Sequence, residues 1–180
     1  MKLFENIRAK MGYALLRRKA RELSRNKTFN NLETSVSVAI LFDYDQQGSV
    51  SLVRSFASEL ESKGKNVSLL GITSGVGGGD DAVIKLVSLQ KLTFLCYPDN
   101  EAVIDPFLKK DFDILINLCG KDCLVLDYIL GLSKARFKVS PQLENDAFAD
   151  FILRFSNPGP QDAAVILKKV REYLAGMQKA

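Results

Sequence analysis

The strongest constraint on the fold of this chain is an alternation, from residue 36 almost to the end, between short apolar runs and segments with helical spacing. The runs at 36–42, 66–72 and 113–118 are mostly apolar and strand-sized. Strands of this kind are typical of a parallel sheet whose two faces are both covered by helices. The alternation therefore predicts an α/β fold, a three-layer Rossmann-like sandwich with a mostly parallel sheet and right-handed crossovers.

The individual elements follow from apolar spacing and from the residues that begin and end helices. Strands are predicted at 36–42, 66–72, 92–97, 113–118, 135–139 and 151–156, and helices at 49–63, 81–89, 100–108, 122–134 and from about residue 160 to residue 174. Gly64 is predicted to end its helix as a C-cap residue, and Pro106 to interrupt the helix around it. In such a sheet, a small ligand is expected outside the carboxyl ends of the strands.

The first 27 residues form a basic segment of their own. They carry nine Lys or Arg against two Glu, a net charge of +7, whereas the whole chain carries +4. An apolar stripe of Phe4, Ile7, Met11 and Leu15 predicts a helix here. The polar stretch 26–35 is typical of a linker. We therefore predict a basic N-terminal helix and linker over 1–34 and a Rossmann-like domain over 35–180.

Two interpretations of the basic helix stay open. It could be an arm that binds an acidic protein, RNA or an anionic membrane surface through Arg17, Arg18, Lys19 and Arg21. Alternatively, its apolar stripe packs on its own domain and the cations are merely solvated, which the lack of interleaved aromatic residues for base stacking favours. The same stripe would also allow two copies to pair as a homo-oligomer.

The glycine cluster at 73–82, TSGVGGGDDA, resembles a phosphate-binding loop only in composition. In the dinucleotide pattern G-x-G-x-x-G, counted from Gly75 and Gly77, the third glycine is replaced by Asp80. The loop follows the second predicted strand instead of the first, and two adjacent carboxylates would oppose a phosphate. We interpret the glycines as a flexible connection and Asp80 or Asp81 as a helix N-cap. The chain has no Walker A sequence, which excludes a P-loop enzyme.

Two loops at the predicted carboxyl edge carry polar residues suited to a ligand, one at 43–49 and one at 117–122. The candidate site residues are Asp43, Asp45, Gln46, Ser49, Asn117, Lys121 and Asp122. Asp43 and Asp45 are of the type that holds Mg²⁺ or orients sugar hydroxyls. They could equally form an acidic turn with Ser49 as the cap of the next helix. At the opposite edge, the carboxylates of 111–113 are expected to face solvent where a strand begins.

The composition restricts the available chemistry. The chain has no histidine, so a Ser-His-Asp or Cys-His arrangement is excluded and any general base would have to be a tuned carboxylate, lysine or cysteine. Cys96, Cys119 and Cys123 lie in or beside apolar stretches and are expected to be buried thiols. We therefore predict no catalytic residues, no metal site and no cofactor.

The segment 111–141, DFDILINLCGKDCLVLDYILGLSKARFKVSP, looks like a small family of uncharacterised Bacteroidetes proteins. It also distantly resembles the N-terminal half of heptosyltransferase-type GT-B glycosyltransferases, with Lys134 at the place of a turn glycine and Ser140 at the place of a strand glycine. Those enzymes bind their nucleotide-sugar donor mainly in a second Rossmann domain, which is not expected in this chain. The resemblance implies the fold and does not imply the reaction.

Taken with the absence of a secretory signal or a membrane span, these patterns predict a cytoplasmic protein. The function that we predict is that of a non-catalytic α/β domain that acts through protein or surface interactions. The alternative is a domain that binds a nucleotide, sugar or phosphorylated metabolite, or a fragment related to glycosyltransferases.

Overall fold

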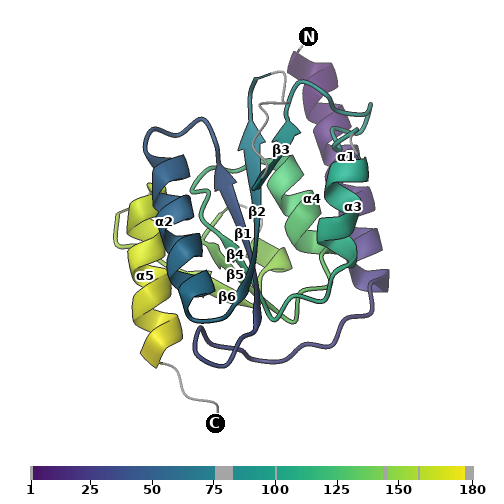
Figure 1. The fold of residues 1–180 in the computed structure, drawn as a ribbon. Coiled ribbons are helices and arrows are strands. Elements are labelled where there is room, and N and C mark those ends of the chain that lie inside the picture. The colour runs from purple at the N-terminus through teal and green to yellow at the C-terminus, as the bar shows by residue number, and fades with distance from the viewer. Residues whose placement is uncertain (1, 76–82, 100, 144–145, 158, 177–180) are drawn as a thin grey trace.

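A computed structural model describes residues 2–75, 83–99, 101–143, 146–157 and 159–176 (Figure 1). Its centre is a six-stranded, all-parallel sheet with strand order β3-β2-β1-β4-β5-β6. The strands are β1 (Ser37–Asp43), β2 (Asn66–Thr73), β3 (Ile84–Ser88), β4 (Ile114–Asn117), β5 (Phe137–Pro141) and β6 (Phe151–Leu153). The helices are α1 (Lys2–Glu22), α2 (Ser49–Ser62), α3 (Glu101–Lys109), α4 (Leu124–Leu132), α5 (Ala163–Gly176) and the short 3-10 helix η1 (Asp146–Phe148). The predicted α/β, Rossmann-like fold is confirmed.

Helices cover both faces of the sheet: α2 and α5 lie on one face, and α1, α3 and α4 on the other (Figure 1). Side chains along β1 alternate between these two layers. Val38, Ile40 and Phe42 pack with α2 and α5, whereas Ala39 and Leu41 pack with α1, α3 and α4. Because all five side chains are fully buried, β1 is apolar at every inner position instead of alternating with polar residues.

The helix α2 shows how the sequence sets element ends. Val53, Phe56 and Leu60 are buried on one side of it, as the spacing predicts. The C-cap residue is Lys63 and not Gly64, which follows it with φ +77° and stops the helix there. At the other end, the N-cap is Gly48, also with positive φ, and not Ser49. The Ser49 hydroxyl instead donates to the carbonyl oxygen of Asp43 at 2.6 Å, so its predicted capping role is wrong.

Two predicted elements between residues 81 and 97 are wrong. The predicted helix at 81–89 contains strand β3, which pairs with β2. A short apolar run does not distinguish a buried strand from a helix. Here the segment forms a strand because its backbone pairs with β2. The segment 92–97 is a tight turn instead of a strand, closed by hydrogen bonds from Thr93 N to Tyr97 O and from Cys96 N to Thr93 O. The predicted N-caps Asp80 and Asp81 lie outside the described residues.

The helix α3 continues for three residues beyond Pro106, to Lys109, so the predicted interruption is absent. At the amino edge of the sheet, Asp111 is exposed as predicted, but Asp113 is not solvent-facing. Its carboxylate is 15% exposed and accepts hydrogen bonds from the backbone N–H groups of Val36 and Ser37, both at 2.9 Å. Asp113 thus holds the entry of β1 beside β4.

The basic helix α1 packs on the domain, and of the predicted stripe Leu15 packs against the core, whereas Ile7 and Met11 do not. Leu16 is fully buried, and a Cβ at Gly12 would lie 2.6 Å from the carbonyl oxygen of Leu95. Ile7 and Met11 are instead 47% and 52% exposed. The helix could approach this closely only where glycine leaves room for the neighbouring backbone.

The polar stretch after α1 runs along the domain. Thr28 N donates to Arg136 O at 3.2 Å, and the rings of Phe29 and Phe137 meet edge to face with centroids 5.1 Å apart. Asn31 accepts hydrogen bonds from the backbone of Glu33 and Thr34. The division into segments 1–34 and 35–180 stays a prediction.

Candidate functional site

The two candidate loops meet at the carboxyl edge of the sheet through an ion pair. Lys121 Nζ lies 2.9 Å from the Asp43 carboxylate, which is 16% exposed. The hydrogen bond and the charge of Asp43 raise the pKa of Lys121. β1 and β4 are neighbours in the sheet, so the loops that follow them lie side by side. Asp43 and Lys121 therefore satisfy each other.

Asp45 points away from this pair toward the end of β2. Its carboxylate accepts hydrogen bonds from Thr73 Oγ1 at 2.7 Å and from the backbone N–H of Ser74 at 2.6 Å. The Ser74 hydroxyl also donates to it at 2.5 Å. These bonds, that of the Ser74 hydroxyl first, lower the pKa of Asp45. Asp45 thus joins the loops after β1 and β2. Among the described residues, no group of three or more His, Cys, Asp or Glu could hold a metal ion.

Asn117 is buried at the carboxyl edge of the sheet, where its side chain makes hydrogen bonds inside the protein. Its Nδ2 donates to Ser140 Oγ at 3.1 Å, and its Oδ1 accepts from the backbone N–H of Cys119 at 2.9 Å. The side chain is 0% exposed, so its contacts are those of a residue that connects β4 to β5. Asp122, in contrast, lies exposed just before α4.

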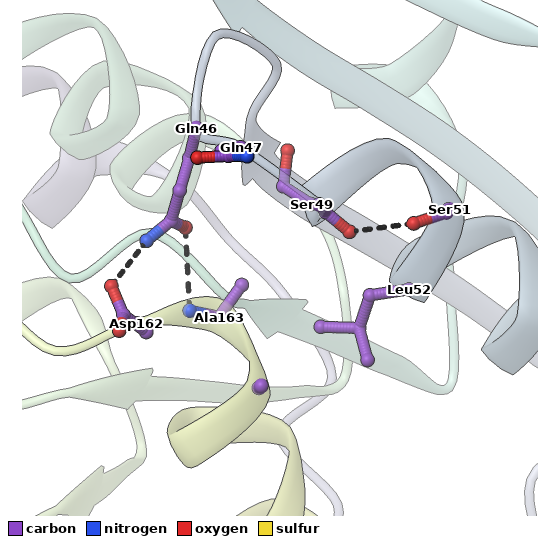
Figure 2. A pocket seen from close by; sticks show the side chains of 9 residues that line it. Gln46, Gln47, Ser49, Ser51, Leu52, Asp162 and Ala163 are labelled. Atoms are coloured by element: carbon purple, nitrogen blue, oxygen red, sulfur yellow. Dashed lines mark hydrogen bonds between the residues drawn. The ribbon is translucent and has the colours of Figure 1, made fainter.

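Gln46 and Ser49 belong to a pocket of about 620 Å³ between the beginnings of α2 and α5 (Figure 2). Gln46 bridges the two helices: its Nε2 donates to the Asp162 carboxylate at 2.7 Å and its Oε1 accepts from Ala163 N at 3.3 Å. It thereby supplies the start of α5 with an acceptor. Of the seven predicted site residues, only Gln46 and Ser49 line this pocket, whereas Asp43, Asp45, Asn117, Lys121 and Asp122 lie outside its wall.

The thiols at this edge are protonated near neutral pH. Burial raises the pKa of Cys119 to about 11, and it also raises the pKa of Cys123. Cys119 is buried as predicted, while Cys96 and Cys123 are only half-buried, and all three are free thiols. A nucleophilic cysteine needs a lowered pKa, so neither Cys119 nor Cys123 has the environment of one.

A second candidate surface lies on α1 and on the turn at 92–97. Among the α1 side chains that the structure describes, from Ile7 onward, five cations are exposed: Lys10, Arg17, Arg18, Lys19 and Arg21. Beside them, Ile7 and Met11 are about half exposed, and Phe94 is 68% exposed at the tip of its turn. Arg8 connects the two parts, since its Nε donates to Phe94 O at 2.7 Å and its guanidinium lies 5.0 Å from the ring centroid. We call these residues of α1, together with Phe94, the α1 surface.

A match to a known sequence family includes both candidate sites. The model of a family of unknown function, DUF6913, matches residues 8–176. The chain belongs to the DUF6913 family. The matched range includes α1 from Arg8 onward as well as the whole sheet. The α1 surface is therefore part of the DUF6913 domain, except for Ile7. No curated protein matches the chain.

Sequence reasoning found the cations of the DUF6913 chain but missed Phe94. The run 92–97 is apolar and was assigned to a buried strand, and only the hydrogen bonds of the turn reveal that Phe94 projects outward. In the described part of the chain, no helix is both long enough and apolar enough to cross a bilayer.

Proposed function

We propose that this DUF6913 protein acts by binding and not by catalysis, and that the α1 surface is its contact with an anionic membrane. One observation carries the proposal: α1 is held on the domain through Leu16 and Gly12, while cations and apolar side chains are exposed along the rest of the helix. A helix with cations and apolar residues on its accessible side is suited to the boundary between lipid headgroups and acyl chains.

The carboxyl edge of the sheet supports a binding role. Asp43, Asp45 and Asn117 are each engaged by a neighbouring loop or strand. A general base must be able to reach the proton of a substrate, and these groups already accept hydrogen bonds from the protein. With no histidine in the chain and raised pKa values at Cys119 and Cys123, acid–base or thiol chemistry lacks a prepared residue here.

The apolar part of the surface favours lipid over the other two predicted partners. RNA binding of this kind uses several aromatic rings between the cations, whereas the α1 surface as defined contains one ring, Phe94, and Arg8 lies over it. An acidic protein would pair with the cations and leave Ile7 and Met11 without a role. A bilayer uses both, because anionic headgroups attract the cations and the acyl region accepts the apolar side chains. We infer a cytoplasmic protein that binds the membrane reversibly.

The test compares charge reversal on the α1 surface with a matched reversal elsewhere. The chain should co-sediment with vesicles that contain phosphatidylserine and not with pure phosphatidylcholine vesicles. The double variant Arg18→Glu, Arg21→Glu should lose more than about 2 kcal/mol of binding free energy, an affinity weaker by roughly 30-fold or more, since each lost cation contributes about 1 kcal/mol and the new carboxylates are repelled by the anionic lipid. The control Arg154→Glu, Lys168→Glu has the same net charge and exposed positions outside the α1 surface, so it should bind nearly as the wild type.

The proposal is wrong if both vesicle types are bound equally or if the two double variants behave alike. Retention of an acidic protein in place of vesicles would identify the competing partner class.

The alternative of a small-molecule site is supported by the pocket in Figure 2. Asp162 is the only charged side chain on its described wall, which disfavours a phosphorylated ligand and favours an uncharged sugar. The likeness to glycosyltransferases and the Bacteroidetes relationship stay predictions. A rise in melting temperature with an uncharged sugar, lost in Gln46→Ala, would support this function. A panel of sugars that leaves the melting temperature unchanged would count against it.

A further inference from the structure

A second cavity, of about 280 Å³, lies on the other side of the sheet from the pocket in Figure 2. It is enclosed by the end of α1 and the chain just after it, by the C-terminal end of α4, by β5 and by η1. Figure 1 shows α1 and α4 side by side over this part of the sheet. Ser24, Lys27, Lys138 and Phe148 are among its lining residues.

Lys138 is the most unusual of them. It lies near the beginning of β5 with its side chain on the α4 side of the sheet, because its neighbours Phe137 and Val139 pack on the opposite layer. The residue is only 2% exposed, and its Nζ donates to the carbonyl oxygen of Leu130 near the end of α4. A buried ammonium ordinarily has a carboxylate partner, and the described contact of this one is a neutral carbonyl.

The charged side chains on the described wall of the cavity are all cations: Arg25, Lys27 and Lys138. The carboxylate of Asp150 pairs with two of these cations but does not line the described wall. Both of its oxygens are taken by Arg25, at 2.7 and 2.5 Å, and one of them also accepts from the backbone N–H of Lys138. Lys27 Nζ is farther from Asp150, at 3.6 Å, and its side chain is 70% exposed.

The exposure of these cations distinguishes the mouth of the cavity from its base. Lys27 and Ser24 are exposed, so they lie at the mouth of the cavity. Lys138 and Arg25, with side chains at most 9% exposed, lie at its base. One carboxylate thus serves three cations, and the excess positive charge faces the cavity. Such a site attracts a small anion, and its volume accommodates one tetrahedral oxyanion with water.

We propose that this cavity binds an oxyanion of the phosphate or sulfate class, which Lys138 and Arg25 hold from below and Lys27 contacts at the mouth. The cavity shares no described lining residue with the α1 surface, and the proposal does not rest on membrane binding. Its ligand is either free phosphate or a phosphate group of a small metabolite, since both present the same oxyanion.

Binding at this site should be linked to protonation of Lys138. Burial and, after it, the charges of Arg25 and Lys27 lower the pKa of its ammonium, Asp150 acts in the opposite direction, and the resulting pKa is about 7. A bound anion would favour the charged amine, so binding takes up a proton when the free amine is neutral. The affinity should therefore fall about tenfold for each pH unit above about 7.

The experiment is a calorimetric titration of the full chain with sulfate, whose charge is constant between pH 6 and 9. Wild type should bind saturably at pH 6 and progressively more weakly above pH 7. Lys138→Met should abolish both the binding and its pH dependence. Lys27→Met, at the exposed mouth, should weaken binding several-fold without affecting the fold, and Lys91→Met at the carboxyl edge should change nothing. Titration with inorganic phosphate and with a sugar phosphate then distinguishes the two sources of the oxyanion.

Two results would overturn the proposal: no saturable heat with sulfate or phosphate at pH 6, or equal binding by wild type and Lys27→Met. If Lys138→Met fails to fold, the Lys27 variant and the pH profile of the wild type decide. A wild-type affinity that is constant from pH 6 to 9 would remove Lys138 from the site.

Discussion

At the scale of single residues, the packing of α1 depends on a buried acid. Asp127 on α4 is 1% exposed, and one carboxylate oxygen accepts a hydrogen bond from the Tyr13 hydroxyl of α1 at 2.7 Å. The other oxygen has no partner. Burial raises the pKa of Asp127 to about 6, and the hydrogen bond from Tyr13 only partly offsets this. The contact between α1 and the domain thus includes a group whose ionisation is unfavourable.

This predicts a pH-dependent stability that Asp127→Asn should change. The folded-state pKa lies above the ordinary value of 3.8, so the folded chain holds this proton more tightly than the unfolded chain. The resulting contribution is complete below about pH 4 and is lost as the pH rises through 6. The loss amounts to about 3 kcal/mol at pH 8. Urea unfolding at pH 5 and pH 8 should show wild type losing stability relative to Asp127→Asn. An equal change in both chains, or the same difference in exposed Asp111→Asn, would contradict the assignment.

At the scale of elements, α1 is an integral layer of the domain despite its charge. Leu16 is fully buried against the helices of that face, and Tyr97 donates its hydroxyl proton to the carbonyl of Gly12 at 2.5 Å. Just beyond α1, Arg25 is held between Asp150 and the carbonyl oxygens of Ala135 and Arg136. The same helix thus contributes to the core and carries the α1 surface.

Deletion of residues 1–27 should therefore destabilise the protein. Removal of the Leu16 side chain alone should cost about 2–5 kcal/mol, the usual range for a buried leucine. The deletion also removes Arg25 and leaves the carboxylate of Asp150, whose side chain is 16% exposed, without its main partner. Urea denaturation of residues 28–180 should give a lower midpoint than the whole chain, whereas Arg18→Glu, Arg21→Glu should leave the midpoint nearly unchanged. An unaltered midpoint after deletion would mean that α1 is a dispensable arm.

At the scale of the whole molecule, the parallel sheet separates two regions that hold different groups, its carboxyl edge and the helix layer of α1 and α4. The carboxyl edge holds the polar loops after β1, β2 and β4, which bind one another and leave the pocket between α2 and α5. The layer of α1 and α4 holds the second cavity with Lys138. The α1 surface is presented outside both. Each proposed contact can therefore be altered by substitution without disturbing the others.

The sequence by itself determined the layered α/β fold, because buried parallel strands must be apolar on both faces and helices must be apolar on one. It also determined the excess of cations near the N-terminus and the lack of histidine chemistry. It did not distinguish a strand from a helix at Ile84–Ser88, where five residues contain too few periods and pairing with β2 decides. Nor did it identify Phe94, Asp127 or Lys138. The exposure of Phe94 and the unpartnered oxygen of Asp127 depend on neighbours 80 or more residues away in the sequence. The burial of the Lys138 amine depends on the packing of α1 against α4 and β5. Such contacts between distant segments exist only once the chain has folded, so the tertiary structure alone decided them.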